Sequence, residues 1–343
     1  MISRDVTALI NWYQREKRDL PWRNTRDPYL IWLSEVILQQ TRVEQGLPYY
    51  QRFQEFFPTV SDLAKASQDE VLACWQGLGY YSRGRNLHAT AQLIHQQGQF
   101  PASYQSLLEL KGIGPYTAAA IASFAFHESV AVLDGNVFRV VSRFLADSSP
   151  IDSTATRKKF QLLLNEWIAF TQHPHLFNQA TMELGALVCT PKNPKCNECP
   201  LQSHCEAFAK NTVTNYPVKK GKTKVVPLHL YYAVVKKDDL FFVVKRPEQG
   251  IWAGLFDFPS VESEDNTDAI LQLTQQLNLK DVSWMEGKTL NHVLSHRKIT
   301  AHFHETICDF IPTENGIWKS SEELVRSGVS ALLKKYVQTT HIR

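Results

Sequence analysis

The sequence lacks any apolar run long enough to cross a membrane, because charged residues interrupt every hydrophobic stretch. Its first residues, MISRDVTALI, lack the charged, apolar and small-residue pattern of a secretory signal. It also lacks internal repeats, long low-complexity tracts and a marked excess of either charge, since 37 Lys and Arg face 34 Asp and Glu. These absences exclude a disordered or fibrous chain and predict a cytoplasmic protein that contacts no membrane.

The chain of 343 residues is too long for one ordinary hydrophobic core, so we expect at least two domains. Residues 1–210 carry apolar positions at three- and four-residue spacing, which predicts an all-α domain of about ten short helices. Residues 228–343 contain β-rich segments such as LHLYYAVVKK and LFFVVKRP, with DAILQLTQQLNL and EELVRSGVSALLKKY as helices, which predicts an α+β domain. Residues 211–227, with four Lys and no acidic residue, form the predicted linker.

Cysteine is scarce outside one cluster. Four of the six cysteines form the pattern Cys-x6-Cys-x2-Cys-x5-Cys, at Cys189, Cys196, Cys199 and Cys205. A tight cluster in a chain without a secretory signal favours a metal site over a disulfide framework. Four thiolates can bind one [4Fe–4S] cluster or one zinc ion, and the presence of only one short Cys-x2-Cys pair favours iron–sulfur modestly.

Two glycines, Gly112 and Gly114, interrupt the helical pattern in LLELKGIGPYTAAA. We expect one helix to end at Leu110 and the next to start at Thr117, with a tight turn between them. The free N–H groups of the second helix would then attract a phosphate, as in helix–hairpin–helix motifs that bind a DNA backbone. An ordinary connection between two helices is the alternative, and the glycines alone do not decide between them.

Two carboxylates lie in settings that suit chemistry. Asp134, in AVLDGNVF, can cap the helix that starts near Val137, which is its plain structural interpretation. Glu35 has Ile31 and Leu38 as its i−4 and i+3 neighbours, and two apolar neighbours disfavour a solvated helix face. A carboxyl group in an apolar setting keeps its proton near neutral pH, so Glu35 is a candidate general acid.

The hairpin LKGIGPYTA, the aspartate in VLDGNV and the cysteine loop resemble, in this order and spacing, the helix–hairpin–helix DNA glycosylases with an iron–sulfur cluster. The resemblance covers residues 1–210 and implies a six-helix barrel subdomain over about 21–134. It also implies an iron–sulfur subdomain from 1–20 and 135–210, with a [4Fe–4S] cluster on the four cysteines.

The residue before the hairpin threonine separates two kinds of glycosylase within this superfamily. Bifunctional members such as endonuclease III carry a Lys there, whose amine forms a Schiff base with the sugar. This chain has Tyr116 at that position, and its only nearby amine is Lys111. Together with the segments PWR, SEVILQQTRV, GLGYYSR and ELGALVCTP, this substitution resembles the adenine DNA glycosylases of the MutY family.

The resemblance implies a role for each catalytic group in cleaving the bond between adenine and its sugar. Glu35 would protonate the adenine ring, and ionised Asp134 would stabilise the oxocarbenium-like sugar, with Tyr116 and Asn136 orienting them. The target base must leave the duplex to be reached. The resemblance assigns contacts with DNA or the flipped base to Trp22, Arg23, Leu38, Gln39, Gln40, Thr41, Tyr80, Gly112, Gly114 and Gln179.

The C-terminal domain resembles a Nudix domain related to MutT. KRPEQGIWAGLFDFPS resembles the strand and loop before the Nudix helix, but no R-E-x-x-E-E run follows, so magnesium-dependent hydrolysis is not expected. In the MutY family a loop with an aromatic residue, Ser and His reads 8-oxoguanine. Here HVLSHRKI supplies Ser295 and His296, with Leu294 at the aromatic position.

The leading hypothesis is a monomeric, monofunctional glycosylase that excises adenine mispaired with 8-oxoguanine or guanine from double-stranded DNA in base excision repair. Such a substrate places the protein at the nucleoid within the cytoplasm. Three alternatives are a bifunctional lesion glycosylase and lyase like endonuclease III, a non-catalytic DNA-binding protein, and a Nudix hydrolase with a helical appendage.

Overall fold

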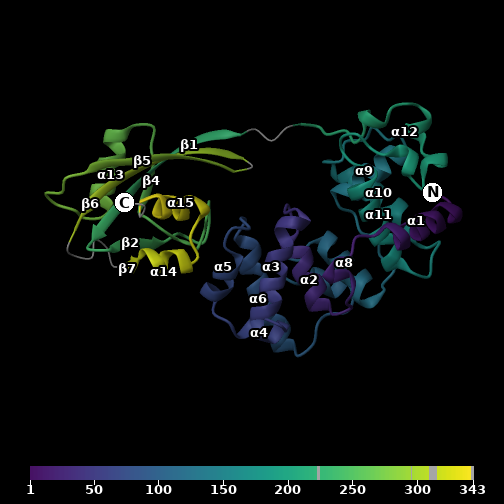
Figure 1. The fold of residues 1–343 in the computed structure, drawn as a ribbon, viewed down its shortest axis with the longest axis horizontal. Coiled ribbons are helices and arrows are strands. Elements are labelled where there is room, and N and C mark those ends of the chain that lie inside the picture. The colour runs from purple at the N-terminus through teal and green to yellow at the C-terminus, as the bar shows by residue number, and fades with distance from the viewer. Residues whose placement is uncertain (222–224, 295, 309–314, 341–343) are drawn as a thin grey trace. The chain divides into compact units, whose positions relative to one another are not determined.

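A computed structural model describes residues 1–221, 225–294, 296–308 and 315–340. The chain divides into two compact units. The first unit consists of Met1–Ala64 and Ala89–Lys222, and the second consists of Lys65–His88 and Thr223–Arg343. Figure 1 shows helices through the first two hundred residues and a sheet after them. No helix in the described part of the chain is long and apolar enough to cross a membrane.

The first unit is helical, as predicted. Its α-helices are α1 (Ser3–Glu16), α2 (Pro28–Ile37), α3 (Val43–Phe56), α7 (Tyr104–Leu108), α8 (Pro115–Phe126), α9 (Gly135–Phe144), α10 (Thr154–Ile168), α11 (Pro174–Leu187) and α12 (Glu206–Ala209). Its 3-10 helices are η1 (Pro21–Arg23), η2 (Cys196–Glu198), η3 (Gln202–His204) and η4 (Val213–Asn215). Helices α4 (Val60–Lys65) and α6 (Ser82–Gln97) each span a boundary between the units, and α5 (Gln68–Trp75) belongs to the second.

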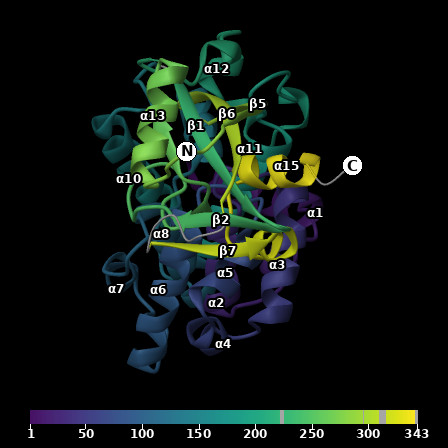
Figure 2. The ribbon, with the colours of Figure 1, turned by 90° about the vertical axis from the view of Figure 1, so that its left-hand side faces the viewer.

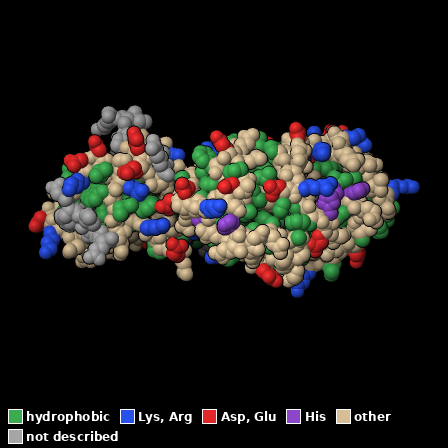
Figure 3. Space-filling view, turned by 90° about the horizontal axis from the view of Figure 1, so that it is seen from below, with side chains coloured by type: hydrophobic (Ala, Val, Ile, Leu, Met, Phe, Trp, Pro, Cys, Tyr) green, Lys and Arg blue, Asp and Glu red, His purple; other side chains and the backbone are tan. Residues whose placement is uncertain are grey.

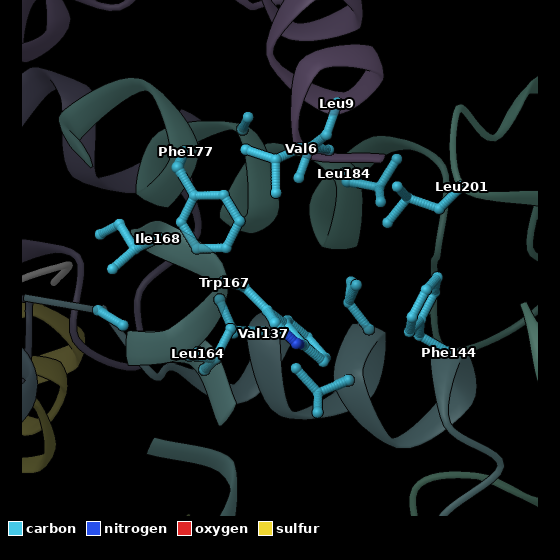
Figure 4. Packing of buried hydrophobic residues seen from close by; sticks show 14 of the residues in the cluster. Val6, Leu9, Val137, Phe144, Leu164, Trp167, Ile168, Phe177, Leu184 and Leu201 are labelled. Atoms are coloured by element: carbon cyan, nitrogen blue, oxygen red, sulfur yellow. The ribbon is translucent and has the colours of Figure 1, made fainter. Parts of the chain in front are cut away.

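One hydrophobic core joins α1, α9, α10 and α11 in the first unit. Figure 4 shows Leu9 of α1 and Phe177 and Leu184 of α11 in this core, with Val137 of α9 and Trp167 of α10. All five side chains are buried, and each buried side chain of this size stabilises the fold by about 1.5–3 kcal/mol. This packing fixes α9 and α11, the two helices that carry Asn136 and Gln179.

The second unit contains a mixed sheet. Its strands are β1 (Val226–Lys237), β2 (Leu240–Lys245), β3 (Phe256–Asp257), β4 (Ser260–Glu262), β5 (Met285–Val293), β6 (Arg297–Ile307) and β7 (Gly316–Ser320). Within the described residues the order is β3-β2-β1-β6-β5, with β4 paired to β1 and β7 to β2. Only the central pair, β1 and β6, is parallel among these pairings.

Helices cover both faces of this sheet. Figure 2 shows α13 (Asn266–Gln276) and α15 (Ala331–Thr340) on opposite sides of β1 and β6. Successive side chains of β1 point to opposite faces of the sheet. Tyr232 is buried in the core on the α15 side, and Tyr231 is buried in the core on the α13 side. A strand buried on both faces reads as a continuous apolar run, which is why LHLYYAVV is predicted so clearly.

The segment EELVRSGVSALLKKY forms two helices instead of the single helix expected. Helix α14 (Ser321–Arg326) ends before Gly328, and α15 begins at Ala331. The Ser330 side chain accepts a hydrogen bond from the backbone N–H of Leu333 at 3.0 Å, so Ser330 starts a new helix.

The surface mixes both charges. Figure 3 shows acidic and basic side chains interspersed over one face, with a group of His side chains close to a basic one. In the first unit, the rings of His127 and His175 are stacked with their centroids 4.1 Å apart, and His173 lies 6.0 Å from His175.

Candidate active site

A cavity of about 190 Å³ in the first unit is lined by residues of η1, α2, α8, α9 and α11 and of the segments beside them. Nine residues predicted to act in catalysis or binding line it: Trp22, Arg23, Glu35, Leu38, Thr41, Tyr116, Asp134, Asn136 and Gln179. They are spread over more than 150 residues of sequence, so only the folded helices bring them together.

Glu35 lies on α2 with only 7 % of its surface exposed. The Tyr116 hydroxyl donates a hydrogen bond to Oε2 of Glu35. Burial raises the pKa of the Glu35 carboxyl to about 7, and the nearby Asp134 raises it further against the opposing effects of Tyr116 and Arg23. A carboxyl group with this pKa holds its proton at neutral pH and can also release it, as a general acid must.

Asp134 is the N-cap of α9, as its plain structural interpretation predicts. Its Oδ1 accepts the backbone N–H of Val137 at 2.7 Å, and its Oδ2 accepts Nδ2 of Asn136 at 3.0 Å. Burial raises the pKa of the Asp134 carboxyl, while these hydrogen bonds and the charge of Arg139 lower it. The carboxylate is therefore capped on one side and faces the cavity on the other.

Two arginines meet a buried carboxylate in the cavity wall. Glu183 has no exposed side-chain surface and accepts hydrogen bonds from the side chains of Arg18 and Arg23, with the closest pairs at 2.6 and 2.7 Å. These arginines hold the pKa of Glu183 down to about 2 against the opposing effect of burial. Arg18 and Glu183 were not predicted as site residues, although Glu183 lies four residues after Gln179 and therefore on the same face of α11.

Trp22 lines the cavity and also packs in the core, since its ring lies edge-on against Tyr50 with the centroids 5.2 Å apart. Gln39 does not line the cavity, and its Nε2 donates a hydrogen bond to Oγ1 of Thr117 at 3.3 Å. Gln40 has a left-handed φ of 58°. Gln40 thus makes the turn that follows α2.

The predicted hairpin is formed. Gly112 has φ 82°, which favours glycine, and both Gly112 and Gly114 are exposed. Helix α7 ends at Leu108 and α8 begins at Pro115, two residues before the expected start at Thr117. An N–H group at the first position of a helix has no intrahelical partner, so proline loses no hydrogen bond there and is favoured at this position. This preference explains why α8 starts at Pro115.

The four clustered cysteines line one small cavity of about 30 Å³, together with Arg143. Burial raises the pKa of the Cys199 thiol to about 12, and it raises those of Cys196 and Cys205 as well. Neighbouring thiols that resist ionisation by themselves release their protons when a metal cation binds them. The donor set therefore fits a metal cluster with four thiolate ligands.

Arg139 connects the catalytic and cysteine regions. Its Nη2 donates to Oδ1 of Asn136 at 2.8 Å and to the carbonyl of Gly185 at 2.7 Å, and its Nε donates to the carbonyl of Cys189 at 2.7 Å. Asn136, which binds Asp134, is thereby tied to the first cysteine of the loop. The spacing of three residues from Asn136 places Arg139 on the same helix face and is the signal that could have identified it.

The second unit has its own cavity of about 720 Å³, lined by Tyr80, Trp252, Leu294 and His296 among others. Tyr80 has a left-handed φ of 47° and is 47 % exposed. His296 is exposed, and Ser295 lies outside the described residues. Two of the predicted contacts to DNA, Tyr80 and His296, are therefore in the same cavity wall.

Comparisons with known proteins agree with this arrangement. The model of the HhH-GPD superfamily of base excision DNA repair proteins matches residues 33–168, the iron–sulfur binding domain of endonuclease III matches 189–205, and the NUDIX domain matches 230–339. A solved thermostable thymine-DNA glycosylase aligns with TM-score 0.55 and 27 % identity, over 61 % of this chain and 97 % of that one. The chain is thus a base-excision glycosylase of the helix–hairpin–helix class that also carries an iron–sulfur domain and a Nudix domain.

Relatives that match most of the chain identify the family within this class. The adenine DNA glycosylase of Buchnera aphidicola from Schizaphis graminum is 33 % identical over 87 % of this chain and 82 % of its own length. The human adenine DNA glycosylase is 33 % identical over 96 % of this chain and 73 % of its own length. The chain belongs to the adenine DNA glycosylase family. The predicted fold, family and [4Fe–4S] cofactor are confirmed.

Proposed function

We propose that this protein is a monofunctional glycosylase that releases adenine from double-stranded DNA where adenine is mispaired with 8-oxoguanine or guanine. The observation that carries the proposal is the carboxyl group of Glu35, which is buried, has a pKa of about 7 and is held by Tyr116 in the cavity wall beside Asp134. Acid chemistry at a flipped base requires such a group.

In the proposed reaction, Glu35 donates its proton to a ring nitrogen of adenine, which makes the base a better leaving group. The bond between that base and C1′ of the sugar then breaks, and Asp134 stabilises the cationic sugar electrostatically. Water then adds to C1′ and releases a proton that restores the acid form of Glu35, so the products are free adenine and an abasic site. Asn136 holds Asp134 by its 3.0 Å hydrogen bond, and Tyr116 holds Glu35.

The cysteines Cys189, Cys196, Cys199 and Cys205 are proposed as the ligands of the [4Fe–4S] cluster. These thiolates would hold the cluster, and their binding to it would order a loop that has few apolar residues of its own. Gly112 and Gly114 are proposed to approach a DNA phosphate, because the exposed turn leaves room for it and the N-terminus of α8 attracts an anion.

We further propose the division into a glycosylase domain (1–210), a linker (211–227) and a recognition domain (228–343). The iron–sulfur match ends at residue 205 and the Nudix match begins at 230, which supports these limits. In this division the loop with Leu294, Ser295 and His296 reads the base opposite adenine. The protein acts as a monomer on chromosomal DNA.

Single-turnover release of adenine from duplexes with adenine opposite 8-oxoguanine, guanine, thymine or cytosine tests the proposal. We expect release opposite 8-oxoguanine and guanine, and little opposite thymine or cytosine. Borohydride trapping distinguishes the bifunctional alternative, since a strong covalent adduct with strand nicking would contradict the monofunctional mechanism. No release of adenine from any duplex would overturn the proposal.

A further inference from the structure

Tyr13 lies on α1, outside the cavity, yet its hydroxyl reaches a residue of the cavity wall. Its side chain is almost fully buried, with 1 % exposed. The hydroxyl donates a hydrogen bond to Oε1 of Gln179, which lines the cavity from α11. Burial raises the pKa of Tyr13, so its hydroxyl keeps its proton and stays a donor.

This contact decides which end of the Gln179 amide is available to a ligand. A glutamine amide has an accepting oxygen and a donating NH₂ group, and a half-turn of the amide exchanges them. With Oε1 bound by Tyr13, the Nε2 group has no hydrogen-bond partner among the described residues. The guanidinium of Arg23 lies 5.6 Å from the centroid of the Tyr13 ring and helps to fix that ring.

We propose that Tyr13 is a positioning residue that fixes the Gln179 amide so that its Nε2 donates a hydrogen bond to a ring nitrogen of the flipped base. The proposal rests on the proposed function of adenine excision. The ring nitrogens of adenine accept hydrogen bonds, whereas its 6-amino group donates them. A fixed donor in the wall therefore recognises the ring itself, and the amide loses less entropy on binding because it is already oriented.

The test compares single-turnover adenine release by wild type, Tyr13→Phe, Gln179→Met and the double variant. Tyr13→Phe keeps the buried ring and removes only the hydroxyl. We expect it to slow release about three- to tenfold, the range of one modest hydrogen bond. The double variant should be no slower than Gln179→Met, because Tyr13 acts only through Gln179.

A second substrate tests which end of the amide meets the base. Purine without the 6-amino group keeps the ring nitrogens, so Tyr13→Phe should slow its release by the same factor as for adenine. If the effect is confined to adenine, Gln179 contacts the amino group through its oxygen, and the proposed orientation is overturned.

Tyr29→Phe is the matched control, since Tyr29 is equally buried and its hydroxyl donates to the carbonyl of Phe57 at 2.7 Å, away from the cavity. It should leave release unchanged. A Tyr13→Phe rate equal to wild type, or a double variant slower than Gln179→Met by the Tyr13→Phe factor, would overturn the inference.

The test can still be decided if the Tyr13→Phe variant fails to fold. If Tyr13→Phe alone does not fold, the double variant leaves no polar group unpaired, and its comparison with Gln179→Met still decides the question. A wild-type protein that releases no adenine refutes the proposed function and this inference together. Wild-type release with an unchanged Tyr13→Phe rate refutes the inference alone.

Discussion

Glu35 is the residue on which the proposed chemistry depends most, because its pKa of about 7 keeps a proton available at neutral pH. Glu35→Gln preserves size and removes the acid. We expect it to bind the mispaired duplex while single-turnover adenine release falls about 10²–10⁴-fold, the usual contribution of a general acid. Glu55→Gln, an exposed carboxyl on α3, is the control and should release adenine at the wild-type rate.

The pH dependence of the same reaction follows from the protonation of Glu35. Its acid form is the active one, and the raised pKa means that this form is lost as the pH rises through about 7. Single-turnover rates of the wild type should therefore fall on the alkaline side, and Glu35→Gln should show no such fall. A single-turnover rate that falls at low pH but stays constant at high pH would argue that Glu35 is not the proton donor.

His175 gives a prediction for stability. Burial and the neighbours His127, His173 and Arg26 lower its pKa to about 4, so the folded protein binds fewer protons here than the unfolded chain. This contribution to stability is present above about pH 6.5 and is lost as the pH falls towards 4. Allowing for its partial exposure, we expect about 1 kcal/mol between pH 7 and pH 5. His175→Gln should lose less thermal stability over this interval than the wild type or the control His95→Gln.

Sequence alone predicts some site residues much better than others. Glu35 is predicted from its apolar neighbours at helical spacing, and Asp134 from its position before a helix. Tyr13 reads as an ordinary core residue, because its ring is indeed core and only its hydroxyl reaches Gln179. Contacts between side chains that are 166 positions apart depend on how α1 and α11 pack, which no local pattern encodes.

At the scale of elements, the approach of α9 to α11 depends on Gly185. A Cβ atom at this position would lie 2.6 Å from Cβ of Asn136 and 3.0 Å from its carbonyl oxygen. Gly185→Ala must push the two helices apart, which we expect to destabilise the protein by about 1–3 kcal/mol. Adenine release should also slow, because Asn136 holds Asp134. Thermal unfolding and single-turnover rates measure the two effects, and wild-type values for both would contradict the packing argument.

The cysteine loop is a second element with a testable dependence. Cys199→Ser removes one proposed ligand, and we expect loss of the broad visible absorbance and of about four irons per chain, with weaker binding of DNA. Cys74→Ser is the control, since Cys74 does not line the cysteine cavity and should leave colour and iron unchanged. Cys199→Ser with full iron content would remove Cys199 from the ligand set.

Elements were predictable where a local signal marks their ends. The helical region, the strands β1, β2, β5 and β6, and the hairpin follow from periodicity and glycines. The short strand β7 and the break between α14 and α15 were missed, because pairing with β2 and the capping of Leu333 by Ser330 decide them. The pairing of β7 is a tertiary contact that no local pattern encodes, whereas the Ser330 cap is a local signal that starts a new helix after Gly328.

At the scale of the whole molecule, the residues proposed to excise adenine and those proposed to read the opposite base belong to different units. Glu35, Tyr116 and Asp134 belong to the first unit, whereas Leu294 and His296 belong to the second. A change in the second unit should therefore alter the choice of mispair with little effect on the chemical step. The Nudix match covers residues 230–339 of this unit, which also contains Lys65–His88. The sequence lacks the carboxylates of a Nudix hydrolase, which favours recognition over catalysis.

Leu294 provides the sharpest test of this separation. It is partly buried against the sheet core and lines the cavity that also contains Tyr80 and His296. An aromatic side chain stacks on a base with roughly 1–3 kcal/mol. We therefore expect Leu294→Phe to raise the preference for adenine opposite 8-oxoguanine over guanine by about fivefold or more. His296→Ala should lower that preference about tenfold, since one hydrogen bond to a base edge is lost.

The measurement is the ratio of single-turnover adenine release from the two duplexes at equal enzyme excess, so that a general loss of activity cancels. Ile307→Phe is the matched control, because it adds an aromatic ring to an exposed position of β6 that does not line the cavity. Its ratio should equal that of the wild type. If Leu294→Phe and His296→Ala both leave the ratio unchanged, the loop does not read the opposite base, and discrimination must come from residues of the glycosylase domain.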